Sequence, residues 1–361
     1  MTAPDKRFWH GRRVLVTGHT GFKGSWLACW LIRMGAHVSG LALPADASAN
    51  LYKLLNLTYD NEFLIDLRDA AATRHAVDVV KPQIVLHLAA QALVRRSYVD
   101  PVESIATNVL GTAHLLDALR NQDGVEAIVV ATSDKAYANP AYDAATVQRP
   151  FIESDPLGGR DPYSASKGAQ EIVARSFAQS FFKARGVPLA TARAGNVIGG
   201  GDWAEDRLMT DVIRSLTHGQ PVTLRNPNAT RPWQHVMEPV AGYLLYAEAL
   251  TTRKDCTRAL NFGPGTAHSV AEVVDLAIAD WPGAPGWKMA DGPNTEAMPE
   301  AATLALDASL AATTLGWRPV LDLTTTVKWV TDWHRAHLAG NDMQTTTRRQ
   351  IDAYEELITA P

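Results

Sequence analysis

A glycine loop near the amino terminus constrains the fold more than any other feature of the chain. The triplet Gly18-x-x-Gly21-x-x-Gly24 follows a short apolar run, Val14 to Thr17, and opens an amphipathic stretch from Phe22 to Met34. This order of strand, tight turn and helix is the setting that a dinucleotide-binding fingerprint requires. The pyrophosphate of such a ligand is expected at the N-terminus of the helix, where free backbone amides and the helix dipole favour an anion.

The first half of the chain alternates short apolar runs with helical stretches. That rhythm is typical of a parallel sheet with helices on both faces. We therefore predict an α/β fold of the Rossmann type, a doubly wound parallel sheet with a smaller mixed lobe on its C-terminal side. The expected strands are Arg13 to Thr17, Ala36 to Leu41, Phe63 to Ile65, Ile84 to Leu88, Ala127 to Ala131 and Leu189 to Arg193.

The chain changes character beyond Gly195, where loops and short elements with dense turn signals replace the regular alternation. Residues 1–195 are predicted to form the NAD-binding domain, and residues 196–361 mainly a substrate-binding lobe. No Gly/Ser-rich or Pro-rich linker separates the two parts, so the boundary is soft and segments are free to interleave.

Composition narrows the range of partners. Of the 361 residues, 46% are hydrophobic, and the formal net charge is -4 with acidic and basic residues interspersed. This pattern offers no electrostatic footprint for nucleic acid or for an anionic membrane. Only Cys29 and Cys256 are present, which favours a reducing compartment over a disulfide framework. We expect a cytoplasmic protein, without a metal or a membrane span, that binds small molecules or further copies of itself.

Each glycine of the loop has its own expected part in holding a cofactor. Gly18 permits the tight turn, Gly21 lets the backbone approach the pyrophosphate, and Gly24 lets the helix pack on its strand. Asp66 could hold an adenine amino group, although capping of a helix explains it equally well. The other cofactor-binding candidates lie in the same loop or after the third and fourth strands: Thr20, Phe22, Lys23, Leu67, Leu88, Ala89 and Ala90.

The end of the second strand favours NAD over NADP. The segment Leu41-Ala42-Leu43-Pro44 carries neither a carboxylate nor an arginine that could clamp a 2′-phosphate. His19 and Lys23 are unusual inside a glycine loop. We expect both to be solvated, since a cation at a helix N-terminus opposes the macrodipole, with a contact between Lys23 and a phosphate as the alternative.

The segment Tyr163-Ser164-Ala165-Ser166-Lys167 carries the main catalytic candidates. Tyr163 and Lys167 lie one helical turn apart and share a helix face. A tyrosine acts as a base near neutral pH only if positive charge favours its phenolate, and both Lys167 and an oxidised nicotinamide bring such charge. Lys167 can also hold the nicotinamide ribose, and Ser133, at the end of the fifth strand, can bond the reacting hydroxyl.

With these motifs, the chain resembles extended short-chain dehydrogenases/reductases, and within them the nucleotide-sugar 4,6-dehydratases, most closely the branch that acts on CDP-glucose. The resemblance runs over nearly the whole length. It rests on the glycine loop and on four further strings: Thr132-Ser133-Asp134-Lys135, Asp155-Pro156-Leu157-Gly158-Gly159, Arg193-Ala194-Gly195-Asn196-Val197-Ile198-Gly199-Gly200-Gly201-Asp202-Trp203 and Arg231-Pro232-Trp233-Gln234-His235.

The resemblance implies a redox-neutral dehydration of CDP-glucose to a 4-keto-6-deoxy sugar. A hydride leaves C4 for NAD while Tyr163 takes the hydroxyl proton, and the 4-ketone makes the C5 proton acidic. A base removes that proton, an acid protonates the departing C6 hydroxyl, and the hydride returns to C6. The implied acid is Asp134, whose carboxyl must be protonated near pH 7 by an apolar setting.

Lys135 stands where related dTDP-glucose dehydratases carry glutamate, and three roles stay open for it. In the first role its neutral amine acts as the C5 base. In the second its charged amine stabilises the enolate, and in the third it forms an ion pair with Asp134. The role of base is favoured.

A nucleotide diphosphate needs cations and aromatic faces, and the second half of the chain supplies both. Arg231 is the strongest candidate for binding the diphosphate. For each arginine taken alone, a place on the protein surface explains its presence at least as well as contact with a ligand. Recognition of cytosine is implied by the resemblance alone. The candidate substrate-binding residues are Asn196, Arg207, Arg225, Arg231, Trp233 and His235, with Trp203 interleaved.

The stretches from Val102 to Leu119 and from Ser164 to Ala184 carry apolar helix faces. The resemblance implies a homodimer or higher homo-oligomer through these helices, and packing within one chain explains the same pattern. Asp134 and Lys135 argue against a 4-epimerase, which has no need of them, and the complete set of Ser133, Tyr163 and Lys167 argues against a non-catalytic NAD-binding regulator. An NADP-dependent reductase, which would change the redox state of its cofactor in each turnover, stays open.

Overall fold

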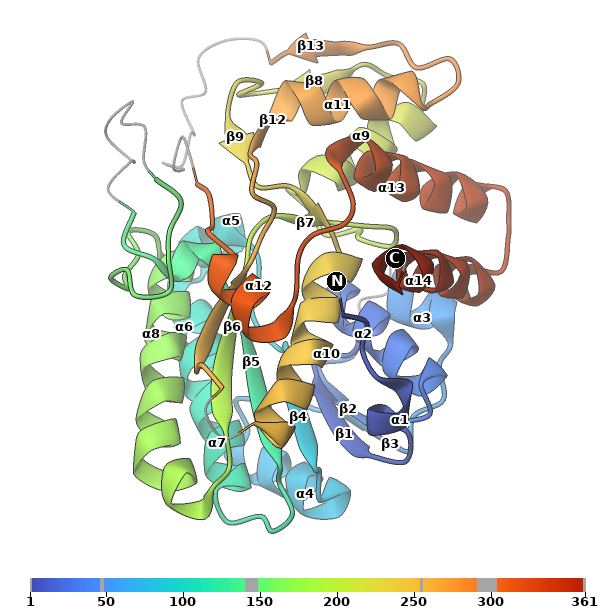
Figure 1. The fold of residues 1–361 in the computed structure, drawn as a ribbon. Coiled ribbons are helices and arrows are strands. Elements are labelled where there is room, and N and C mark those ends of the chain that lie inside the picture. Colours follow the sequence, from blue (N-terminus) through green and yellow to red (C-terminus); the bar gives the residue numbers. More distant parts are fainter. Residues whose placement is uncertain (1, 46–48, 140–148, 254–255, 291–303, 360–361) are drawn as a thin grey trace.

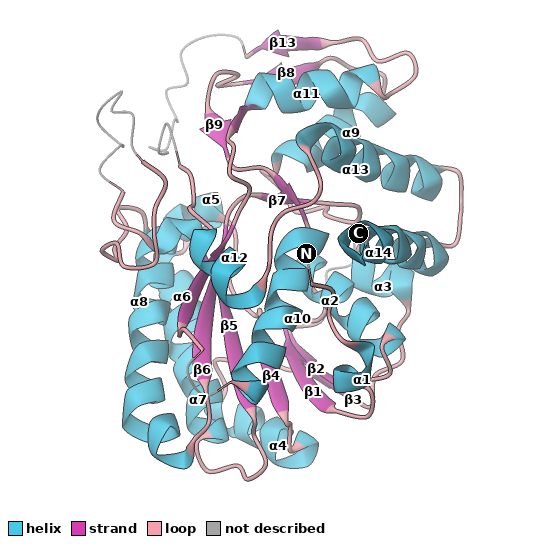
Figure 2. Ribbon diagram, in the orientation of Figure 1, coloured by secondary structure: helices cyan, strands magenta, loops and turns pink. Residues whose placement is uncertain are grey.

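The protein is described by a computed structural model that covers residues 2–45, 49–139, 149–253, 256–290 and 304–359. Its centre is a seven-stranded parallel sheet in the order β11-β6-β5-β4-β1-β2-β3, with helices on both faces (Figures 1 and 2). The predicted doubly wound α/β fold is confirmed. The strands of the sheet are β1 (Arg13–Thr17), β2 (His37–Ala42), β3 (Asn61–Leu64), β4 (Ile84–His87), β5 (Ala127–Ser133), β6 (Leu189–Ala194) and β11 (Ala259–Phe262).

The central strands are apolar throughout because both faces of the sheet are covered. Every residue of β4, β5 and β6 is buried, as expected for parallel strands between two helix layers. Along β1, Val14 and Val16 face one layer while Leu15 faces the other. The strand order reverses between β1 and β4, and ligands of such sheets bind beyond the carboxyl ends at this point.

Two helix layers flank the sheet. One contains α2 (Phe22–Arg33), α10 (Met237–Thr252) and α14 (Met343–Thr359), and the other α4 (Ala70–Val80), α7 (Thr112–Leu119) and α8 (Pro162–Phe177). The remaining helical segments of the first half are α1 (Lys6–Trp9), α3 (Leu51–Leu55), α5 (Val94–Val99), α6 (Pro101–Ile105), η1 (Ala106–Gly111), η2 (Asp134–Ala136), η3 (Ala178–Phe182) and η4 (Lys183–Arg185).

A smaller mixed lobe lies above the carboxyl ends of the strands (Figure 1). It has its own apolar core, built from short strands and helices of the second half of the chain. The strands pair as β7 (Val197–Ile198) with β10 (Gln234–His235), β8 (Val222–Leu224) with β13 (Trp287–Met289), and β9 (Thr230–Arg231) with β12 (His268–Ser269). The helices of this lobe are α9 (Leu208–Thr217), α11 (Val270–Ala279) and α13 (Leu323–Leu338), whereas α12 (Ser309–Leu315) packs on β11 and α10 beside the sheet.

The sheet and its helix layers draw on both halves of the chain. Strand β11 pairs with β6 at the edge of the sheet, and α10 packs against β5, although both lie beyond residue 195. The sequence did not predict β11, because Asn261 interrupts its short apolar run. That buried side chain instead accepts a hydrogen bond from Tyr137 and donates to the carbonyl oxygens of Phe151 and Asp307. The division at residue 195 stays a prediction, and β11 and α10 are segments that interleave.

Candidate functional site

Of the three glycines in the loop between β1 and α2, one leaves room for a ligand. Gly18 has a φ of +76°, and a Cβ there would lie 2.7 Å from the Ala89 backbone nitrogen. At Gly24 a Cβ would lie 2.1 Å from the Gly18 carbonyl oxygen. A Cβ at Gly21 would meet, among the described residues, only the Gly18 oxygen at 3.3 Å. The protein itself therefore requires Gly18 and Gly24, while the open side of Gly21 fits the close approach of a pyrophosphate.

The other candidates for cofactor contact surround this loop. The Thr20 hydroxyl donates to the Leu43 carbonyl oxygen, and Phe22 lies against Gly199 of the second half. Leu67 is buried beside Gly111. Leu88, Ala89 and Ala90 follow β4 and are half-buried, directly across from Gly18.

Asp66 is engaged within its own segment. Its carboxylate accepts hydrogen bonds from the Arg68 guanidinium at 2.6 Å and 2.9 Å, and this contact holds the pKa of Asp66 below its usual value. The capping residue of α4 is Asp69, so the alternative of Asp66 as a helix cap is wrong. Contact of Asp66 with an adenine stays a prediction and requires that the carboxylate keep a free lone pair.

His19 is buried, so the expectation that it is solvated is wrong. Its Nε2 lies 2.9 Å from Glu62 Oε1, and the rings of Tyr52 and Tyr59 pack edge-on against it. Burial lowers the pKa of His19 despite the neighbouring Glu62. A Cβ at Gly40 would lie 2.6 Å from the ring, so a glycine on the neighbouring strand makes the room for it.

Lys23 is half-buried against Tyr243 of α10 rather than fully solvated. Its Nζ lies 3.5 Å from the Tyr243 hydroxyl and 5.8 Å from the centre of that ring. Burial and the positive charge of Arg207 lower the pKa of Lys23 to about 8, against the opposing effect of Asp134 and Asp202. The expectation of a solvated lysine is wrong, and contact with a phosphate stays a prediction.

Ser133 and Asp134 form a hydrogen-bonded pair where β5 ends and η2 begins. The Ser133 hydroxyl donates to Asp134 Oδ1 at 2.9 Å and accepts the backbone N–H of Lys135. Asp134 is 2% exposed, and its Oδ2 has no hydrogen-bond partner among the described residues. Burial raises the pKa of Asp134, although Lys135, Ser133 and Arg231 act against it. A buried carboxyl with an unsatisfied oxygen is suited to hold a proton.

Tyr163 lies beside this pair in the first turn of α8, where Asp161 caps the helix. Burial raises the pKa of Tyr163 to about 12, and a hydrogen bond with Ser133 and the charge of Arg207 oppose the rise. We expected Lys167 to lower this pKa. For the protein groups by themselves the pKa is raised instead, because burial outweighs the charge of Arg207, and an effect of Lys167 stays a prediction.

Lys167 is 3% exposed and donates a hydrogen bond to Gln170 Oε1 at 2.9 Å. Burial and the charge of Lys23 lower the pKa of Lys167 to about 7. Near neutral pH the amine is therefore divided between its charged and neutral forms.

Some of the predicted substrate-binding residues face this cluster. Arg207 and Arg231 are close enough to act on Tyr163 and Asp134 respectively, and Arg207 Nε is buried without a partner among the described residues. Asn196 precedes β7 and is half-buried. Trp233 is buried and its indole N–H donates to the His268 carbonyl oxygen.

Two predicted substrate contacts are engaged with other side chains. Arg225 is exposed and pairs with Asp206 at 3.8 Å. His235 has no exposed surface and packs edge-on between Trp26 and Trp329, so it has no face for a ligand and its assignment to the substrate is wrong. Trp203 likewise packs against the aromatic side chains of Trp333, His334 and His337.

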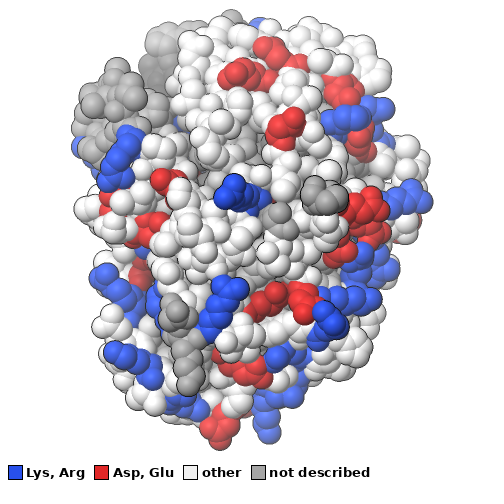
Figure 3. All heavy atoms as spheres, viewed as in Figure 1, with Lys and Arg blue, Asp and Glu red and all other residues white. Residues whose placement is uncertain are grey.

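The surface adds two further observations. On the face drawn in Figure 3, acidic and basic side chains are interspersed, as they are along the sequence.

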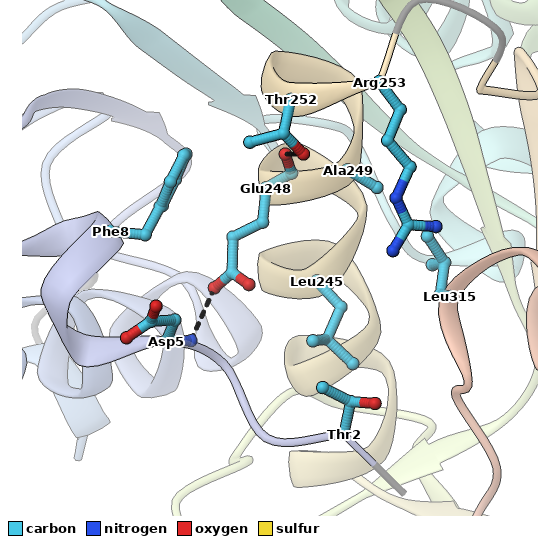
Figure 4. Close-up of a pocket in the computed structure, with 9 residues that line it drawn as sticks. All are labelled: Thr2, Asp5, Phe8, Leu245, Glu248, Ala249, Thr252, Arg253 and Leu315. Atoms are coloured by element: carbon cyan, nitrogen blue, oxygen red, sulfur yellow. Dashed lines mark hydrogen bonds between the residues drawn. The ribbon is translucent and has the colours of Figure 1, made fainter.

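A hollow beside α10 is lined by residues of the N-terminal segment and the last turns of that helix, among them Asp5, Phe8, Glu248 and Arg253 (Figure 4). Since α10 ends shortly before β11 begins, this hollow lies towards the amino ends of the strands and contains none of the cluster residues.

Comparison with known proteins decides the family. Residues 15–330 match the family described as GDP-mannose 4,6 dehydratase. The chain belongs to this dehydratase family. A CDP-glucose 4,6-dehydratase of Salmonella typhimurium strain LT2 is 45% identical over 98% of this chain and 99% of its own length. The predicted resemblance to nucleotide-sugar 4,6-dehydratases is thus confirmed.

Epimerases are more distant relatives of this dehydratase-family chain. A UDP-glucose 4-epimerase of Halalkalibacterium halodurans is 29% identical over 91% of this chain and 97% of its own length. The crystal structure of Thermus thermophilus UDP-glucose 4-epimerase in complex with NAD is 29% identical to this chain in sequence, with a TM-score of 0.73. The match covers 90% of this chain and 99% of that one.

Among the helices of the described residues, none has the length and apolar character that a membrane span requires.

The sequence analysis missed several polar residues beside the cluster of Ser133, Asp134 and Tyr163. Thr17, His87, Thr112 and Gln170 are fully buried and hydrogen-bonded to one another, and the Tyr243 hydroxyl lies beside Lys23. A signal existed only for His87, the one ionisable residue inside an otherwise apolar strand.

Proposed function

We propose that the protein converts CDP-glucose to CDP-4-keto-6-deoxyglucose with NAD as cofactor, as a hydro-lyase without net redox change. The observation that carries the proposal is the buried cluster of Ser133, Asp134 and Tyr163 beside the glycine loop, in which one carboxylate oxygen has no partner among the described residues. The relative at 45% identity, which bears the name of this activity, supports the choice of substrate.

The protein fits NAD at the crevice. The open side of Gly21 would admit the pyrophosphate, and Lys167 would hold the nicotinamide ribose. The half-buried residues after β4, Leu88 to Ala90, would line the bound dinucleotide. When bound, NAD supplies an acceptor for a hydride from the sugar and returns that hydride at the end of the cycle.

Tyr163 takes the proton of the C4 hydroxyl in this proposal, and Ser133 orients that hydroxyl. A phenol whose pKa is about 12 is almost entirely protonated near neutral pH and cannot accept a proton in that form, so positive charge must be added close to it to favour the phenolate. The charged form of Lys167 and the cationic ring of oxidised nicotinamide are the two sources.

Asp134 protonates the departing C6 oxygen. The partnerless Oδ2 would carry the proton, since the other oxygen accepts from Ser133. A Cβ at Gly195 would lie 3.4 Å from Oδ2, so this oxygen faces the segment that leads into the substrate lobe. Lys135 is half-buried and its positive charge acts on Asp134. Its favoured role as the base at C5 requires in addition that the amine be neutral when the proton is taken.

The diphosphate is assigned to Arg207 and Arg231, which act on the catalytic cluster from the substrate lobe. Asn196 and Trp233 complete the set that lies near the crevice mouth. The buried Nε of Arg207 has no partner among the described residues, so it is a hydrogen-bond donor that an anionic ligand would satisfy. Arg225 would contribute only if its side chain left Asp206.

A homodimer or higher homo-oligomer in the cytoplasm completes the proposal. Val99 and Val102 are 74% and 73% exposed, and Ile105, Leu110, Ile172 and Phe181 are also exposed on the helices of the same layer as α8. Apolar side chains that gather in this way are typical of a subunit interface. Cys29 and Cys256 are both free thiols, which is consistent with a reducing compartment.

The experiment is an incubation of the purified protein with NAD and, separately, CDP-glucose, dTDP-glucose, UDP-glucose and GDP-mannose. The expected result is a product lighter by one water from CDP-glucose alone, without accumulation of NADH. Product of unchanged mass but altered sugar stereochemistry would favour an epimerase, and net NADH formation would favour a reductase. Loss of water from none of the four would overturn the proposal.

A further inference from the structure

A chain of buried hydrogen bonds connects the catalytic lysine to the strand that carries the glycine loop. Lys167 Nζ donates to Gln170 Oε1 at 2.9 Å, and Gln170 Nε2 donates to the Thr112 hydroxyl at 2.8 Å. That hydroxyl lies 2.8 Å from His87 Nε2, and His87 Nδ1 lies 2.6 Å from the Thr17 hydroxyl. Thr17, His87, Thr112 and Gln170 have no exposed surface.

The direction of every bond in this chain follows from one carbonyl group. The Thr112 hydroxyl lies 2.7 Å from the Asn108 carbonyl oxygen, which can only accept, so Thr112 donates its single proton there. Its two lone pairs then accept from Gln170 and from His87. The proton of His87 must therefore sit on Nε2, which leaves Nδ1 as an acceptor.

The same reasoning fixes both ends of the chain. Because His87 Nδ1 accepts, the Thr17 hydroxyl donates to it, and the Thr17 oxygen accepts the backbone N–H of Ala89 at 3.2 Å. At the other end the Gln170 amide presents N–H to Thr112 and thus its carbonyl oxygen to Lys167. Burial and the charge of Lys167 lower the pKa of His87 to about 3, so the ring is neutral.

We propose that Gln170 is a positioning residue for Lys167, and that Thr112, His87 and Thr17 lock its amide so that an acceptor always faces the amine. The chain links the catalytic lysine to Thr17 and Ala89, which border the glycine loop on β1 and after β4. The role of Lys167 in the chemistry rests on the proposed function, whereas the direction of these hydrogen bonds does not.

An acceptor in a buried site favours the charged form of an amine. Removal of the Gln170 carbonyl should therefore lower the pKa of Lys167 further, and a carboxylate in its place should raise it. The other groups that act on Lys167 are Lys23 on α2, His87 on β4 and Glu171 on α8, which is paired with Arg193 on β6. The groups that act on its neighbour Tyr163 are Ser133 on β5, Asp134 on η2, Asp161 at the start of α8, and Arg207.

The test uses two isosteric variants, Gln170→Met and Gln170→Glu, and a control, Gln350→Met. The control removes an amide on the distant helix α14 that donates to the carbonyl oxygen of Trp329 on α13. Nuclear magnetic resonance of the lysine ε-carbons reports the titration of Lys167, and the ring-nitrogen shifts of His87 report its tautomer. Neither readout needs turnover. We expect the Lys167 pKa to fall by about one unit in the Met variant and to rise by about one unit in the Glu variant.

The result expected for His87 is the neutral tautomer with its proton on Nε2, without titration near neutral pH. With CDP-glucose and NAD, the alkaline limb of the pH profile for C4 oxidation should move down in Gln170→Met and up in Gln170→Glu, and the Met variant should oxidise about tenfold more slowly above the shifted pKa.

A proton on His87 Nδ1, or equal titration of Lys167 in all three variants, would overturn the inference. A folded Gln170→Met protein whose rate falls by the same factor at every pH would also overturn it, because that outcome marks a merely structural side chain. Absence of dehydration in the unmodified protein, with the expected tautomer and titrations, would instead count against the proposed function alone.

Discussion

Arg193 binds Glu171 through two parallel hydrogen bonds inside the protein, from Nε to Oε1 at 2.9 Å and from Nη2 to Oε2 at 2.8 Å. The two side chains are 4% and 3% exposed. The same carboxylate accepts the hydroxyls of Thr132 on β5 and Thr191 on β6. One buried ion pair thus ties α8, which carries Tyr163, to the two strands beside it.

Removal of one partner of this pair should destabilise the protein strongly. Arg193→Met leaves the Glu171 carboxylate buried without its countercharge, which costs about 3–5 kcal/mol. The double variant Glu171→Leu/Arg193→Met should recover most of that loss, since no charge is left buried. Urea unfolding measures both. The control is Lys328→Met, which removes a surface pair with Asp332 worth about 0–1 kcal/mol; equal losses in Arg193→Met and Lys328→Met would contradict the prediction.

Two substitutions should separate the oxidation step from the elimination step. Asp134→Asn keeps Tyr163 and Ser133 and should retain C4 oxidation while losing water elimination, because the amide cannot protonate the departing oxygen. Tyr163→Phe should lose both steps, with oxidation slowed by about 10²–10⁴-fold. Nicotinamide absorbance in a single turnover and the mass of the sugar nucleotide report the two steps. Full turnover by Asp134→Asn would show that another group is the acid.

Alanine at Gly21 and at Gly24 should have different effects although the two glycines lie three residues apart. The new Cβ at Gly24 would lie 2.1 Å from the Gly18 oxygen, so the loop must move and the fold must lose stability. At Gly21 the nearest described protein atom is 3.3 Å away, a tight contact that a shift of a few tenths of an ångström relieves, so the protein should lose much less melting temperature than Gly24→Ala and should lose affinity for NAD. Thermal unfolding and NAD titration distinguish the two, and unchanged NAD binding in Gly21→Ala would contradict the assigned cradle.

Glu238 should make stability depend on pH. The side chain is fully buried on α10 and accepts the backbone N–H groups of Val320 and Leu321 and the Tyr354 hydroxyl. Burial raises the pKa of Glu238 from 4.5 to about 7. Between these values the folded protein binds the proton more tightly than the unfolded chain, so the free energy of unfolding falls as pH rises through this window, by about 3 kcal/mol in total.

Urea unfolding across that pH window measures this contribution as the difference between the unmodified protein and Glu238→Gln, which cannot titrate and should lack the slope. Tyr354→Phe keeps the carboxyl and removes one donor to it, so the slope should persist. The same slope in Glu238→Gln as in the unmodified protein would assign it to other groups.

The exposed face of α5 and α6 should control the oligomeric state. Val102→Asp places a charge among the exposed apolar side chains there and should convert the proposed homo-oligomer to smaller species, measured by analytical ultracentrifugation. Leu338→Asp, at a residue 54% exposed on α13, is the matched control and should leave the mass unchanged. An unmodified protein that sediments as a monomer would rule out the proposed interface.

Much of the site was predictable because its signals are local. The glycine loop is a strand, a turn and a helix within about one dozen residues, and the spacing of Tyr163 and Lys167 places them on one helix face wherever that helix packs. Helix boundaries also followed the pattern closely, since the predicted stretch from Phe22 to Met34 is the helix Phe22–Arg33.

Residues whose surroundings come from distant segments were misjudged. His19 was expected in solvent and His235 at the substrate, yet each is enclosed by aromatic rings from other elements. The edge strand β11 escaped prediction because its polar Asn261 is satisfied only by partners from remote loops.

The sequence by itself determined the fold class, the family and the set of candidate side chains, because periodicity and motif spacing are properties of neighbouring residues. The tertiary structure alone decided the environment that shifts the pKa values of those side chains. Burial raises the pKa of Tyr163 and of Asp134 and lowers that of Lys167. Burial is a property of the whole packed molecule, and the cost of removing a charge from water depends on every group around it.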